Sequence, residues 1–347
     1  MKMIAHMDMD AFFAAIEERD NPRWAGQPIV VGSEPAIGRG VVSTANYKAR
    51  EYGIRSAMPI RTAYRLAPDA IFLPVNGRVY GQTSQAIMDI IAKHVPLVEQ
   101  ASIDEAYFDL SQYRTWSAAE IACRRVKKEI FKAQRLTCSI GLGANKLIAK
   151  IASDFNKPDG LTVVRPAQMP AFLAPLDIRK IPGIGPKSEQ VLKRRGLDTV
   201  GDIQRMTEAD LYQLFGEWGL DLYDMVRGKG SDELIFEWTA KSIGEQETFD
   251  ADTLESDHIV QALERMCASV IRQFKKDRFT SYRCIVLTVR FADFKTAQKS
   301  HTLEKPAATV SALKTEMMKL LLPFFDRRQN PQKKLIRLVG VRIEKLQ

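Results

Sequence analysis

Two short apolar segments that each carry neighbouring carboxylates constrain this chain more than any other feature. Residues 4–10 alternate in a way that predicts a strand with Asp8 and Asp10 on one face. Asp104 and Glu105 adjoin a second hydrophobic run, which predicts another strand. Carboxylates buried close together repel one another and resist ionisation unless a cation joins them. The pattern therefore predicts a cation site formed by two strands.

Oxygen ligands without His or Cys favour Mg²⁺ or Mn²⁺ over zinc. Two magnesium ions about 3.5–4 Å apart can activate a hydroxyl and stabilise a departing pyrophosphate. Phosphoryl transfer needs little beyond such positioning and positive charge. Acidic residues also end strands where no metal binds, so from these residues alone a structural role for Asp8, Asp104 and Glu105 stays open.

The bulk composition excludes several classes of protein. The 347 residues exceed one ordinary compact domain and predict two to four. With 45% hydrophobic and 27% charged residues, the chain is globular rather than disordered. It contains no run of 18 apolar residues, and its N-terminus reaches Asp8 too early for a secretory signal, so we expect a cytoplasmic protein with no membrane span. The four cysteines lack CxxC spacing and predict reduced thiols, with neither a zinc site nor disulfides.

Positive charge gathers in the C-terminal third. The net charge is +9, and residues 241–347 hold 20 Lys and Arg against 13 Asp and Glu. A basic segment of this kind suggests a polyanionic partner, most often nucleic acid. An ordinary solvated surface with excess lysine explains the charge equally well, so both interpretations remain open at this point.

The pattern of periodicities changes along the chain. Up to about residue 165, predicted strands and helices are mixed, with helices packed on a sheet. Ser117 to Glu120 is predicted to be a capping box that begins one of these helices. Short helices follow to about residue 230, and Gly228 to Asp232 predicts a linker. A further α/β unit then runs to the C-terminus, so the fold class is α+β with several domains.

The sequence segments around the carboxylates resemble those of a known family. The segments Asp8-Met9-Asp10-Ala11-Phe12-Phe13-Ala14-Ala15-Ile16-Glu17 and Ser102-Ile103-Asp104-Glu105-Ala106-Tyr107 resemble the signatures of Y-family, lesion-bypass DNA polymerases, and most closely the DNA polymerase IV branch. The resemblance extends over essentially the whole chain. It implies that Asp8 and Asp104 bridge two Mg²⁺ ions, with Mn²⁺ as a substitute. It adds the backbone carbonyl of Met9 as a ligand and assigns Glu105 to the metal at the primer 3′-end. Asp10 is expected to support the site, and Asp109 to be structural.

The resemblance also implies a pocket for the incoming nucleotide. Phe13 matches the steric gate, whose ring leaves no room for a 2′-hydroxyl and so rejects ribonucleotides. Without the resemblance, Phe13 would be read as a core residue of a helix. The further residues implied to contact the nucleotide are Phe12, Ser43, Thr44, Tyr47, Arg50 and Lys150. Tyr47 and Arg50 are three apart and share a helix face, where a hydroxyl and a guanidinium can meet phosphate.

A glycine-containing turn at residues 181–187 resembles a helix-hairpin-helix, with a packing corner between two helices as the alternative. Glycines let the backbone approach a phosphate, and the next helix presents free N–H groups. Lys241 and Ser242 resemble the entry to the family's C-terminal little-finger domain. The residues expected to contact DNA are Gly183, Gly185, Lys187, Lys241, Ser242, Arg283, Arg290, Lys295 and Lys299. The choice among the last four depends on strand register.

The implied fold is a right-hand polymerase with a palm, small fingers, a helical thumb and an additional α/β little finger. The expected boundaries are palm 1–10 and 74–165, fingers 11–73, thumb 166–230, linker 231–242 and little finger 243–347. The implied activity is low-fidelity, template-directed translesion synthesis without proofreading, by a monomer that binds primer-template DNA and dNTP.

Two other function classes compete with this one. A nucleotidyl cyclase also pairs carboxylates on a sheet, but it needs neither a helix-hairpin-helix nor a basic C-terminal domain. A non-catalytic DNA-binding scaffold would be expected to lose Asp8, Asp104 or Glu105, and all three are present. The apolar peptide with which bacterial relatives dock on a sliding clamp is not seen after the last predicted strand, so the sequence leaves clamp binding open.

Overall fold

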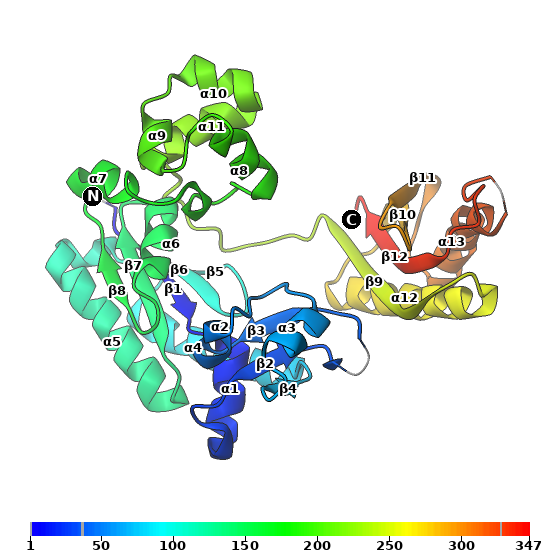
Figure 1. Cartoon of the computed structure of the whole chain (residues 1–347), viewed down its shortest axis with the longest axis horizontal. Coiled ribbons are helices and arrows are strands. Elements are labelled where there is room, and N and C mark those ends of the chain that lie inside the picture. The colour runs from blue at the N-terminus through cyan, green and yellow to red at the C-terminus, as the bar shows by residue number, and fades with distance from the viewer. Residues whose placement is uncertain (1, 36–37, 327) are drawn as a thin grey trace. The chain divides into compact units, whose positions relative to one another are not determined.

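The computed structural model describes residues 2–35, 38–326 and 328–347 (Figure 1). It divides into two compact units, each with a hydrophobic core of its own. The first unit comprises Met1–Ser33, Val41–Met58 and Thr62–Glu237. The second comprises Glu34–Gly40, Pro59–Arg61 and Trp238–Gln347. Among the described residues, no helix is both long enough and apolar enough to cross a bilayer.

A five-stranded sheet in the order β5-β6-β1-β7-β8 forms the centre of the first unit. Its strands are β1 (Ile4–Met9), β5 (Val98–Gln100), β6 (Glu105–Asp109), β7 (Cys138–Gly143) and β8 (Leu161–Val163). The middle strand, β1, pairs antiparallel with both β6 and β7, while β8 pairs parallel with β7. The strand expected at residues 4–10 is confirmed, and it lies at the centre of the sheet.

The two faces of this sheet have different roles. Ala5, Met7 and Met9 of β1 point into the large core, which is shared with α1 (Phe12–Asp20), α4 (Gly77–His94) and α5 (Trp116–Gln134). By strand alternation, Ile4, His6 and Asp8 point to the opposite face. There Ile4 packs with Ala149 of α6 (Lys146–Phe155). The main core is thus kept apart from the face that carries Asp8.

Two helices begin where an unforeseen side chain caps them. The Thr115 hydroxyl accepts from the Ala118 N–H and α5 starts at Trp116, so the capping box predicted at Ser117 is wrong. The extended backbone of Thr115 carries its hydroxyl over the first turn, which leaves Ser117 inside the helix. In the same way, the Asn46 side chain accepts from the Ala49 N–H, so α2 begins after it.

A small three-stranded sheet in the order β3-β2-β4 contacts α1 through β2 and β3. The elements of this region are β2 (Ile29–Gly32), β3 (Val42–Ala45), β4 (Ile71–Leu73), α2 (Tyr47–Glu51) and α3 (Ile60–Leu66). β4 and α3 were not predicted, because segments this short carry too few residues to display a period.

Short helices follow the central sheet, as the sequence predicted. They are α7 (Met169–Leu173), α8 (Pro186–Lys193), α9 (Val200–Gln204), α10 (Glu208–Phe215) and α11 (Glu217–Met225). Single 3₁₀ turns lie at Pro22–Trp24, Ser111–Tyr113, Pro166–Gln168 and Ile178–Lys180. The chain then returns to α6, where the Asn145 side-chain amide donates to the Gly228 carbonyl and the Lys146 N–H donates to the Ser231 carbonyl.

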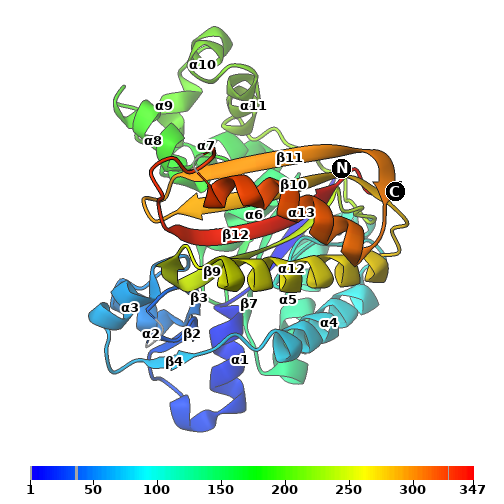
Figure 2. The same ribbon diagram turned by 90° about the vertical axis from the view of Figure 1, so that its right-hand side faces the viewer.

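The second unit contains a four-stranded antiparallel sheet in the order β11-β10-β12-β9. Its elements are β9 (Ser242–Thr253), α12 (Ser256–Lys276), β10 (Tyr282–Phe291), β11 (Thr296–Ala307), α13 (Val310–Phe325) and β12 (Ile336–Glu344). The helices α12 and α13 cover one face of this sheet and bury the inward residues of its strands (Figure 2). The α/β unit expected at the C-terminus is confirmed.

Candidate active site

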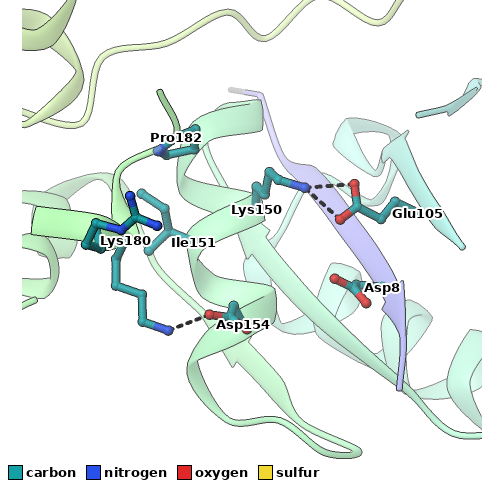
Figure 3. Close-up of a pocket in the computed structure, with 8 residues that line it drawn as sticks. Asp8, Glu105, Lys150, Ile151, Asp154, Lys180 and Pro182 are labelled. Carbon is teal, nitrogen blue, oxygen red and sulfur yellow. Dashed lines mark hydrogen bonds and ion pairs between the residues drawn. The ribbon is translucent and has the colours of Figure 1, made fainter. Parts of the chain in front are cut away.

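The three predicted carboxylate residues lie together at the edge where β1 and β6 meet. Asp8 is directly opposite Glu105 in the strand register, and the Met9 N–H donates to the Asp104 carbonyl at 3.1 Å. Figure 3 shows Asp8 and Glu105 on their neighbouring strands beside Lys150. Residues almost a hundred positions apart in sequence are therefore brought side by side by one strand pairing.

Glu105 is held by cationic and aromatic groups. Both of its oxygens accept from the Lys150 ammonium at 2.7 Å. The Nε2 atom of buried His6 lies 3.7 Å from the carboxylate, beyond hydrogen-bond distance. His6 and Lys150 lower the pKa of Glu105 to about 2, against the opposing effect of burial. Glu105 is therefore ionised at neutral pH and ready to bind a cation. Lys150, expected to contact phosphate, here compensates this charge.

Asp8 has a cationic partner that the sequence reasoning missed. The Lys157 ammonium lies 2.5 Å from the Asp8 carboxylate, and both side chains are less than one-fifth exposed. Burial raises the pKa of Asp8 to about 6, although Lys157 acts in the opposite direction. A signal for Lys157 was present, since it lies in an Asn-Lys-Pro-Asp-Gly turn directly after the helix that carries Lys150.

Asp104 points into its own turn. Its carboxylate accepts from the Ser102 hydroxyl at 2.6 Å, and that hydroxyl oxygen accepts from the N–H groups of Asp104 and Glu105. Within the residues that the structure describes, no three His, Cys, Asp or Glu side chains converge as a metal site. The backbone thus places the predicted ligands next to one another, while the side chain of Asp104 is turned toward Ser102.

The two acidic residues assigned to supporting roles differ from each other. Asp10 lies just beyond the end of β1 and is 3% exposed. Its carboxylate accepts from the Ser139 hydroxyl, from the Asp159 N–H and from the Tyr47 hydroxyl. Asp109 pairs with Lys2 at 3.0 Å, at the other end of β6.

The gate candidate lies against a second aromatic ring. Phe13 is half-buried and stacks on Tyr80 of α4, whose hydroxyl donates to Glu17 at 2.7 Å. Phe12 is 2% exposed and belongs to the main core, so its side chain presents almost no surface to a ligand.

The residues expected to contact phosphate and base lie on β3 and α2. Ser43 and Thr44 are half-buried on β3. Tyr47 and Arg50 are one turn apart on α2, and the Arg50 guanidinium lies 4.7 Å from the centre of the Tyr47 ring. The Arg50 Nε–H donates to the Ala45 carbonyl, while Tyr47 reaches Asp10. These contacts bring α2 to the end of β1.

A cleft of about 450 Å³ extends from the carboxylates to the predicted helix-hairpin-helix turn (Figure 3). Its lining residues are Asp8, Glu105, Lys150, Ile151, Asp154, Arg179, Lys180 and Pro182. Beyond it, Gly183 has φ 92°, Gly185 caps α8, and Lys187 is exposed in the first turn of α8. The predicted turn therefore leads from the cleft to a free helix N-terminus.

Strand register separates the cations of the second unit. Arg290 pairs with Thr296 and lies on the sheet face away from α12 and α13. Lys299 pairs with Leu287, a core residue, so its side chain leaves the sheet on the helix-covered face. Lys295 lies in the turn before β11 and Arg283 is exposed on β10. Lys241 precedes β9, which begins at Ser242.

Known proteins resemble this chain over nearly its whole length. Residues 7–154 match the model of the impB/mucB/samB family, residues 166–197 match the HHH motif of the IMS family, and residues 240–347 match the family's C-terminal domain. DNA polymerase IV 2 of Methanosarcina mazei is 41% identical over 99% of this chain and 92% of its own length. DNA polymerase IV of Methanoculleus marisnigri is 38% identical over 100% of this chain and 95% of its own.

A solved structure agrees with these relatives. The Y-family DNA polymerase chimera Dbh-Dpo4(243-245)-Dbh has a TM-score of 0.87 at 28% identity and covers 99% of each chain. The resemblance stated from the motifs is thus confirmed, and the cyclase alternative does not account for polymerase relatives matched from end to end. The chain belongs to the Y family of DNA polymerases, in the DNA polymerase IV branch, and it is a metal-dependent nucleotidyltransferase that performs low-fidelity translesion DNA synthesis.

Proposed function

We propose that Asp8, Asp104 and Glu105 hold two Mg²⁺ ions, with the Met9 carbonyl as a further ligand, and that nucleotidyl transfer to the primer 3′-hydroxyl takes place at this edge of the sheet. The observation that carries the proposal is the register pairing of Asp8 with Glu105, with Asp104 hydrogen-bonded beside them. Their only close cations among the described residues are Lys150 and Lys157.

The donor set suits magnesium chemically. It consists of oxygens, and Glu105 is ionised well below neutral pH. Burial raises the pKa of Asp8 although Lys157 lowers it, and a bound cation would favour the ionised form. Bound Mg²⁺ would supply Lewis-acid stabilisation of the phosphate oxygens and would lower the pKa of the 3′-hydroxyl. Mn²⁺ has the same ligand preference and is expected to substitute.

The residues around the carboxylates would bind the triphosphate and the sugar. Lys150 and Lys157 now pair with the carboxylates, and a triphosphate with its metal ions would offer both lysines new partners. Arg50 and Tyr47 would add a planar fork and a hydroxyl from α2. Phe13, stacked on Tyr80, would exclude a 2′-hydroxyl.

The remaining segments would hold primer-template DNA. We assign residues 1–10 and 74–165 to the palm, 11–73 to the fingers, 166–230 to the thumb and 243–347 to the little finger. The turn at Gly183 and the N-terminus of α8 would bind backbone phosphate, and Arg290 would do so from the open face of the little-finger sheet.

Primer extension with isosteric variants tests the proposal. Asp104→Asn and Glu105→Gln should each reduce the extension rate by more than about a hundredfold, since even the outer-shell partners of metal ligands are worth ~10–100-fold. Asp109→Asn is the matched control. Asp109 lies on the same strand as Glu105, but its carboxylate pairs with Lys2. If Glu105→Gln extends primers as fast as Asp109→Asn does, the ligand assignment is wrong.

A further inference from the structure

The loop from Lys157 to Gly160, which follows α6 and leads into β8, delivers a lysine to the active site. Lys157 at its start reaches the Asp8 carboxylate at 2.5 Å. The rest of the loop buries almost nothing, since Pro158 and Asp159 are exposed and Gly160 is half-buried. Hydrophobic packing therefore does little to fix this loop, and polar contacts must set the position of Lys157.

The side chain of Lys127, on α5, contacts this loop. Its ammonium donates to the Asp159 carboxylate at 2.7 Å, to the Gly160 carbonyl at 3.1 Å and to the Cys138 carbonyl at 2.5 Å. An ammonium group has three N–H donors, and all three are used here. The side chain is only 15% exposed, although lysines usually extend their charge into water. Lys127 thereby ties the 157–160 loop to the start of β7.

Asp10 binds the same loop from the active-site end of β1. It accepts from the Asp159 N–H and from the Ser139 hydroxyl, both at 2.8 Å, and the Ser139 oxygen accepts from the Gly160 N–H at 3.1 Å. Asp10 and Ser139 thus bind the N–H groups of Asp159 and Gly160. Lys127 binds the Asp159 carboxylate and the Gly160 carbonyl. We call Lys127, Asp10 and Ser139 the loop clamp.

The loop clamp also reaches the nucleotide-binding helix. The same Asp10 oxygen that accepts from Ser139 lies 3.4 Å from the Tyr47 hydroxyl. Asp10 thus connects α2, which carries Arg50, to the loop that carries Lys157. A contact that served only the stability of the sheet would not need to join these two segments.

We infer that Lys127 and Asp10 are positioning residues for nucleotide binding, which hold the 157–160 loop so that the Lys157 ammonium meets the triphosphate beside Asp8. Neither residue contacts substrate itself; each acts through the loop. This inference rests on the proposed function, in which the triphosphate binds at these carboxylates.

Single-turnover primer extension tests the clamp by separating the dNTP dissociation constant from the rate constant of incorporation. Lys127→Met should raise the dNTP dissociation constant by about tenfold, since a misplacement of about 1 Å can cost ~10²-fold and Lys127 acts only through the loop. The affinity for primer-template DNA should remain unchanged. Lys128→Met, which alters an exposed lysine of the same helix, is the control and should match the unaltered protein.

A double-mutant cycle with Lys157→Met decides whether Lys127 acts through the loop. If it does, adding Lys127→Met to Lys157→Met should change the dNTP dissociation constant by less than about twofold, because coupled residues are not additive. A full tenfold effect in the Lys157→Met background would overturn the inference. So would an unchanged dNTP dissociation constant in Lys127→Met alone.

Asp159→Asn covers the case in which Lys127→Met does not fold. It removes the charged acceptor of Lys127 at a side chain that is 63% exposed, and it should weaken dNTP binding in the same direction by a smaller factor. Unchanged dNTP binding in Asp159→Asn would count against the clamp. Failure of the unaltered protein to extend primers in the same assay would refute the proposed function itself, not the clamp.

Discussion

The ring of Phe13 stacks on the ring of Tyr80, with centroids 4.3 Å apart and planes inclined by 12°. Tyr80 is fully buried, and its hydroxyl donates to Glu17 on the same helix as Phe13. The gate candidate is therefore supported by a ring that is itself fixed by packing and by a hydrogen bond.

Phe13→Ala should admit ribonucleotides, because removing the ring removes the clash with a 2′-hydroxyl. We expect the preference for dNTP over rNTP to fall on the order of 10²-fold, as measured by the ratio of kcat/KM values. Tyr80→Phe keeps the stacking surface and is the matched control, with sugar selection close to that of the unaltered protein. Unchanged selection in Phe13→Ala would remove the gate assignment.

Asp8 should make stability depend on pH when metal is absent. Its pKa of about 6 in the folded protein lies above the ordinary value of 3.8, so the free energy of unfolding falls as pH rises from about 4 to about 6. At about 1.36 kcal/mol per pKa unit the loss amounts to about 3 kcal/mol, and it is nearly complete about one unit above pH 6. In EDTA, Asp8→Asn should lack this loss when unfolding is followed in denaturant at several pH values. Curves for the two proteins that run parallel across this range would contradict the assignment.

The two faces of the β11-β10-β12-β9 sheet should differ in DNA binding. Each phosphate contact adds close to one unit to the slope of log affinity against log salt. Arg290→Ala, on the open face, should lower that slope by about one. Lys299→Ala, on the helix-covered face, should leave it unchanged and serves as the control. Equal slopes for the two variants, measured by fluorescence anisotropy over a salt series, would show that register does not decide the contacts.

Two glycines in the short-helix segment allow the effect of backbone strain to be separated from the effect of DNA contact. Gly183 and Gly196 both have positive φ, at 92° and 72°, so alanine at either should cost about 1 kcal/mol or more of stability. A Cβ at Gly183 would also lie 3.5 Å from Trp218, while one at Gly196 would lie in open space. We expect only Gly183→Ala to weaken binding of primer-template DNA. Equal weakening by both variants would point to general destabilisation rather than a phosphate contact at the turn.

Local patterns in the sequence were sufficient for much of the fold. The alternation over residues 4–10 and the turn at residues 181–187 each predicted the element that the structure contains. The prediction of a capping box at Ser117 was wrong, because the choice between Ser117 and Thr115 depends on a backbone conformation that composition does not reveal.

In the candidate site, too, some features follow from local sequence and others only from the tertiary structure. The sequence by itself predicted which carboxylates would carry the chemistry, since Asp8, Asp104 and Glu105 lie in distinctive local segments. Only the tertiary structure decided that Lys157 lies against Asp8 and that Lys127 binds the loop that carries Lys157. It also decided that the Lys299 side chain leaves the C-terminal sheet on the helix-covered face. The physical reason is that a local period reports which face of its own element a residue occupies, whereas strand register and loop placement depend on partners far away in the chain.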